Sequence, residues 1–132
     1  MFKKSLFLGI TSGILAGIAS IIFEQIYLKA FYLDFSTIAS PVALMSACIF
    51  GCVLAAVGYW ALTKWLKQSG EIVFNLLFTI LSFASILGPI ATTLPLDLDA
   101  DLTLMFPGFA ITMHFFPALA WFTLKPLFFK SR

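Results

Sequence analysis

Charged side chains are scarce in this sequence. The chain has 8 basic and 6 acidic residues among 132, while 61% of its residues are hydrophobic. A soluble domain of this length needs many more charges to cover its surface, so the composition excludes that class. The net charge of +2 does not indicate nucleic-acid binding, because the basic residues flank apolar segments instead of forming a patch.

Residues that usually carry catalysis or bind metals are also few. Cys48 and Cys52 lie one helical turn apart, a spacing that rarely meets disulfide geometry. A metal pair would need further ligands, and His114 is the one histidine available. There is no nucleotide-binding loop and no Ser/His/Asp set in a motif context. We therefore expect no catalytic residue, no metal and no cofactor, and we interpret the cysteines as small packing residues.

The chain does contain four apolar blocks. Each is long enough to cross a bilayer core of roughly 30 Å. Their short connections leave no room for a separate soluble domain. Residues 1–132 are therefore predicted to form one all-α domain, an antiparallel bundle of four transmembrane helices. The predicted spans are Leu6–Leu28, Pro41–Leu66, Ile72–Ile90 and Leu104–Leu124.

The basic residues predict an orientation. One side of the predicted bundle carries seven Lys and Arg residues, and the other side carries Lys29 alone. By the positive-inside rule both termini face the cytoplasm, and we expect a bacterial inner (plasma) membrane. A cleaved signal peptide is the alternative for the first block, but its apolar run continues past Ala16–Ala19 to Leu28. The seven residues are Lys3, Lys4, Lys64, Lys67, Lys125, Lys130 and Arg132.

Small residues recur every three or four positions in the first two blocks, so that each predicted helix has a face of small side chains. Such faces allow the close helix contacts on which association in lipid depends. The two helices are therefore predicted to pack as an antiparallel hairpin. The predicted packing face comprises Gly9, Gly13, Gly17 and Ser20 in the first helix and Ala47, Gly51, Ala55 and Gly58 in the second.

Four polar residues are predicted to face the interior of the bundle. Glu24 follows the glycine face, Ser82 and Ser85 lie on a polar stripe that starts at Glu71, and His114 lies near the middle of the fourth span. Ionisable residues inside a membrane are candidates for function, so these four define a candidate polar pocket that opens to the outer side.

Less specific interpretations of the same residues stay open. Glu24 lies near the outer end of its span, where it is either hydrated or protonated and hydrogen-bonded to a neighbouring helix. His114 is alternatively a neutral side chain bonded to Ser82, Ser85 or a carbonyl. The expected difference in depth between Glu24 and His114 is about 8 Å, which argues against a direct ion pair.

The connection before the fourth span holds the acidic cluster of the chain, Asp97, Asp99 and Asp101. Its spacing matches the start of an EF-hand loop, but the later Gly and Glu of that pattern are absent. We expect a solvated outer loop, with calcium binding as the alternative.

One resemblance concerns most of the chain. The small-residue first helix, Gly88-Pro89 at the end of the third, and Met113-His114 ahead of Pro117 in the fourth resemble a group of uncharacterised bacterial four-helix integral membrane proteins. The resemblance implies the architecture and no activity.

The resulting functional hypothesis is a membrane protein that binds or passes a small solute or proton through an interhelical pocket. The alternative is a non-catalytic assembly subunit that presents the Gly9, Gly13 and Gly17 face to a second copy or another membrane partner. A third hypothesis is a membrane enzyme acting on a lipophilic substrate such as a quinone. The lipid bilayer is an expected partner, and nucleic acid is not.

Overall fold

Five helical segments make up the fold in the computed structural model, which describes residues 1–92 and 100–129. Four helices are long and apolar enough to cross a membrane, and the described residues contain no strand. This confirms the predicted all-α, four-helix membrane architecture. The segments are α1 (Phe2–Phe31), α2 (Pro41–Leu66), α3 (Gln68–Ser85), α4 (Leu87–Ala91) and α5 (Ala100–Phe128), with α3 and α4 forming the third spanning unit.

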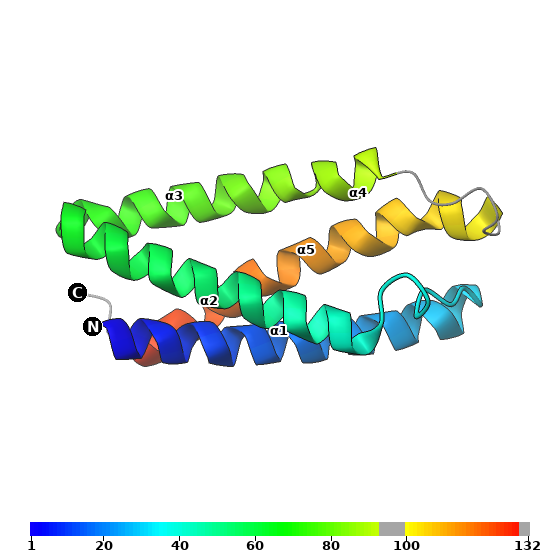
Figure 1. Cartoon of the computed structure of the whole chain (residues 1–132), viewed down its shortest axis with the longest axis horizontal. Helices are drawn as coiled ribbons and strands as arrows, with labels where there is room; N and C mark the ends of the chain where they lie inside the picture. Colours follow the sequence, from blue (N-terminus) through cyan, green and yellow to red (C-terminus); the bar gives the residue numbers. More distant parts are fainter. Residues whose placement is uncertain (93–99, 130–132) are drawn as a thin grey trace.

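The long helices alternate in direction. α1 begins and α5 ends at the same end of the bundle, which also holds the connection between α2 and α3 (Figure 1). In the acidic connection, Asp97 and Asp99 lie outside the described residues, whereas Asp101 lies in the first turn of α5.

Helices α1 and α2 lie in close contact along the glycines of α1. A Cβ atom added to Gly9 would lie 2.6 Å from the carbonyl oxygen of Cys52, and one added to Gly13 would lie 2.6 Å from the Cα of Ile49. A Cβ on Gly17 would collide with Met45. At Gly9 and Gly13 the two backbones approach too closely for any side chain, so glycine is required there, whereas at Gly17 the close neighbour is the flexible Met45 side chain.

The turn between α2 and α3 differs from the sequence expectation. The third span is predicted to start at Ile72, but α3 already begins at Gln68, and the chain reverses at Lys67 with φ 51°. Gly70 lies within α3, where its missing Cβ lets the helix pack directly on the backbone of Leu62. The glycine thus serves close packing, and the positive φ of Lys67 makes the turn.

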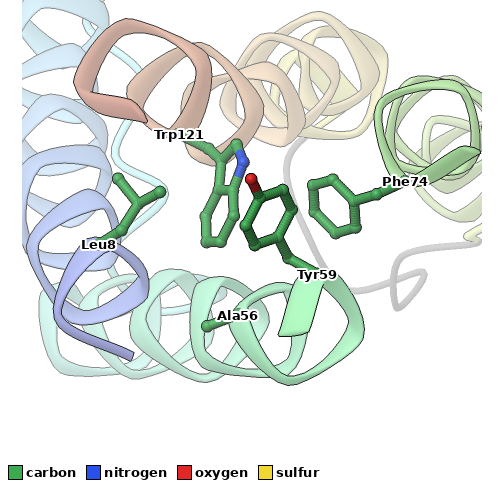
Figure 2. Packing of buried hydrophobic residues seen from close by; sticks show 5 residues of the cluster. All are labelled: Leu8, Ala56, Tyr59, Phe74 and Trp121. Carbon is green, nitrogen blue, oxygen red and sulfur yellow. The ribbon is translucent and has the colours of Figure 1, made fainter. Parts of the chain in front are cut away.

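Aromatic side chains fill the end of the bundle where the α2–α3 turn lies. The Tyr59 ring packs edge-on against Phe74 and Trp121, with centroids 5.1 and 5.9 Å away. Leu8 of α1 and Ala56 of α2 complete the cluster, which therefore joins all four long helices (Figure 2). A second cluster at the opposite end stacks Phe35, from the α1–α2 connection, on Phe109 of α5 at 4.5 Å.

The glycine contacts can be tested by comparing two substitutions of the same kind. Gly13→Ala adds a methyl group against the backbone of α2 and should lower the free energy of unfolding by about 1–3 kcal/mol. Gly51→Ala is the control, because nothing lies within 4 Å of its Cβ position. It should leave stability unchanged or raise it by up to about 1 kcal/mol. Unfolding of the two variants by SDS in mild detergent measures both, and equal losses would contradict the structure.

Candidate functional site

A cavity of about 610 Å³ lies between α2, α3 and α5. Its wall on α2 is formed by the small residues Ala47, Gly51, Ala55 and Gly58. Because these side chains are too short to reach α3 and α5, the space between the helices stays unfilled. The volume lies within the range of about 300–1,000 Å³ that is typical of small-molecule pockets.

The remaining wall is mostly leucine and phenylalanine. Leu77 and Leu81 come from α3, and Phe106 and Phe109 come from α5. Leu54, Leu77 and Leu81 are also 55%, 45% and 63% exposed, so the cavity opens between α2 and α3 onto the outer surface of the bundle. In a membrane that surface faces lipid.

Three of the four predicted pocket residues line this cavity, namely Ser82, Ser85 and His114. The Ser82 hydroxyl donates to the Phe78 carbonyl at 2.8 Å, and the Ser85 hydroxyl donates to the Ser82 carbonyl at 2.7 Å. Both hydroxyl groups therefore donate within their own helix, and each oxygen can still accept a hydrogen bond. His114 is exposed at the border of the cavity, not enclosed in the bundle interior as the sequence predicted. Its ring makes no hydrogen bond among residues 1–92 and 100–129, so its nitrogens remain available to a ligand.

Glu24 is not among the residues that line the cavity. Its side chain is 3% exposed, and its Oε2 atom has no hydrogen-bond partner within the described part of the chain. Ser20, one turn earlier on α1, does line the cavity, and its hydroxyl lies 3.7 Å from the thiol sulfur of Cys48. The structure thus brings together the two serines and the histidine but places the carboxyl group elsewhere.

The predicted packing face divides into two surfaces. Gly9, Gly13 and Gly17 lie against α2 of the same chain, so they are covered without a second subunit. On α2, however, α1 contacts Cys52, Ile49 and neighbouring residues. The predicted face of α2 lies on the adjacent side of the helix and lines the cavity instead. It comprises Ala47, Gly51, Ala55 and Gly58.

Both cysteines are buried and free. The Cys52 thiol lies 3.9 Å from the Pro117 carbonyl of α5, and Cys48 contacts Ser20 of α1. No group of three or more metal-ligating side chains occurs in the described ranges.

Sequence reasoning missed the polar contacts that hold α3 to α5. The Lys125 ammonium lies 2.7 Å from Glu71 Oε1 and donates to Asn75 Oδ1 at 3.2 Å. It also lies 5.1 Å from the centroid of the Tyr59 ring, a cation–π contact. Glu71 and Asn75 start the polar stripe of the third span, and Lys125 follows His114 on one face of the fourth. The sequence signal for this contact was the pair of polar stripes, one on each of these two spans, at the same end of the predicted bundle.

Comparison with protein-family models, with curated proteins and with solved structures finds no match to this chain.

The contacts of Lys125 predict that substitution of Glu71 and substitution of Lys125 lower the free energy of unfolding by different amounts. Glu71→Gln leaves a buried ammonium without its carboxylate and should lower the free energy of unfolding by about 1–2 kcal/mol, a value moderated by the exposure of Glu71. Lys125→Met removes the charge but keeps the packing of the stem, so its effect should be smaller. SDS titration of both single variants and the double variant measures the coupling. Equal stability of Glu71→Gln and the unmodified protein would contradict this role.

Proposed function

We propose that the protein binds a lipophilic small molecule within the bilayer, in the cavity between α2, α3 and α5. One observation carries the proposal: the cavity has the volume of a ligand pocket, an apolar wall, and one histidine without a hydrogen-bond partner among the described residues. Apolar pockets with a few convergent polar groups are the usual form of small-molecule sites.

The chemistry of the wall selects the class of ligand. A mostly hydrocarbon molecule matches the leucine and phenylalanine side chains, and a single polar group on that molecule would bond to His114 or to the hydroxyls of Ser82 and Ser85. Passage of a proton or polar solute is less well supported, since Glu24 lies outside the cavity wall. The assembly hypothesis is also less well supported, because α2 already covers the glycines of α1.

The proposal includes an orientation. Lys3, Lys4, Lys64, Lys67 and Lys125 lie in the helix ends or turn at one end of the bundle, and Lys29 lies at the other. By the positive-inside rule the first end faces the cytoplasm, which we propose for both termini in a bacterial inner membrane.

Filling the cavity should abolish binding. Ala47→Leu and Gly51→Leu place an isobutyl group in the cavity, so saturable photolabelling by a diazirine-bearing fatty acid in proteoliposomes should fall severalfold. Ala43→Leu is the matched control, one turn away on the same exposed part of α2 but outside the cavity wall. Peptide mass spectrometry locates the label, which we expect on α3 and α5. Labelling that does not saturate, or that falls equally in all three variants, would refute a cavity site.

The histidine should act on the polar group of the ligand. His114→Phe retains an aromatic ring but removes both nitrogens, so the affinity for the fatty acid probe should fall by about tenfold, the equivalent of one hydrogen bond of roughly 1–1.5 kcal/mol. Thr112→Val, a polar-to-apolar change outside the cavity on α5, is the control. The concentration that half-saturates photolabelling measures both variants, and an unchanged value for His114→Phe would exclude this role.

A further inference from the structure

A second pocket of about 1340 Å³, with several charged side chains in its wall, lies at the end of the bundle where α1 begins and α2 turns into α3. It is separate from the cavity between α2, α3 and α5, and it does not depend on the function proposed for that cavity. Helices α1, α2, α3 and α5 all contribute to its wall. Its ionisable residues are Lys4, Tyr59, Lys67, Glu71 and Lys125, together with the first residue, Met1.

The pocket has an excess of positive charge. Glu71 is its one acidic residue among the described positions, and that carboxylate is bound to Lys125. The ammonium groups of Lys4 and Lys67 have no ion pair or hydrogen bond within residues 1–92 and 100–129. Two ammonium groups, one from α1 and one from the α2–α3 turn, thus line a shared space in which the described residues offer them no counter-charge.

The backbone conformation at Lys67 is a second sign that its charge has a role in the pocket. Its φ of 51° and ψ of −117° fall where an L-residue is strained and glycine is not. The lysine therefore occupies a turn at some cost in stability, and its charge lines the pocket. α3 starts at the next residue without a side-chain cap, so the positive end of its dipole adds to the same field.

The rest of the wall is apolar. Phe122, Leu127 and Phe128 of α5 line the pocket beside the lysines. Since the pocket lies at the ends of membrane-spanning helices, a ligand that carries an anionic group next to a hydrocarbon portion matches both parts of the wall. Basic pockets between transmembrane helices commonly hold phospholipid head groups.

We propose that this pocket binds a phosphate group, supplied in the membrane by the head group of an anionic phospholipid, with Lys4 and Lys67 as its main ligands. A soluble phosphate compound offers the same chemistry, and the experiment separates the two sources.

The test is titration of the purified full chain in detergent with dioleoylphosphatidylglycerol, with bound lipid measured by native mass spectrometry. Phosphatidylglycerol should bind at least about fivefold more tightly than phosphatidylcholine. Lys4→Gln combined with Lys67→Gln should weaken phosphatidylglycerol binding by about 25-fold, since each lysine near a lipid surface contributes about a factor of five. Equal affinity for the two lipids would overturn the proposal.

Matched controls exist on the same helices. Lys3 and Lys64 lie near Lys4 and Lys67, but neither lines the pocket, and Lys64 lies over the Trp60 ring. Lys3→Gln combined with Lys64→Gln removes the same charge but no group of the pocket wall, so it should weaken binding clearly less than the Lys4 and Lys67 double variant does. Equal losses in the two double variants would show diffuse attraction and overturn a localised site.

Two further arms complete the test. Millimolar inorganic phosphate or glycerol 3-phosphate should leave phosphatidylglycerol bound, whereas displacement would overturn the lipid as the source and assign the pocket to a soluble phosphate compound.

Lys67→Gly should raise the midpoint of thermal unfolding while weakening lipid binding about fivefold. A variant that is more stable and binds as before would overturn the role of Lys67.

Discussion

The contact between the α1 and α2 backbones determines how the other helices are placed. At Gly9 and Gly13 the two chains lie closer than any side chain permits, and this contact directs the Cys52 side of α2 toward α1. In lipid, where apolar burial adds little, such close van der Waals contact is a main source of helix association. Once α2 is turned in this way, its stripe of Ala47, Gly51 and Gly58 faces α3 and α5. The cavity follows from that rotation.

Helix α3 contacts α2 and α5 at a few places and leaves the space beside its cavity-facing leucines open. Gly70 packs on α2, and Lys125 binds Glu71 and Asn75 at the end where the aromatic cluster lies. Farther along, Phe83 contacts Phe115 of α5 with centroids 5.5 Å apart. The polar contacts of Lys125 are sensitive to the loss of one partner, because the remaining charge or donor is then buried without a partner. The stability of the bundle and the shape of the cavity therefore depend on the same few residues at the end of α3.

Much of the architecture could be predicted from the sequence, because length and apolar composition decide whether a segment crosses a bilayer. The glycine spacing of α1 likewise predicted a close helix contact, since only glycine permits it. The rotation of α2 could not be predicted. Ala47 and Cys48 are adjacent in sequence and both small, so spacing alone does not decide which of them faces α1. Glu24 shows a related limit. Its place on the helix indicated an inward-facing side chain, and the side chain is buried. Burial does not specify which neighbours surround a carboxyl group, and Glu24 lies outside the cavity wall that includes His114.

The opening of the cavity between α2 and α3 has a consequence for how a ligand would arrive. Leu54, Leu77 and Leu81 border the opening on the lipid side, so an apolar molecule already dissolved in the bilayer could enter sideways without crossing water. Partitioning concentrates such a molecule in the membrane. The free energy of binding then reflects only the difference between its contacts with the cavity wall and its contacts with the surrounding acyl chains. Selectivity would then come chiefly from His114 and the two serines, because lipid tails compete for every other part of the wall.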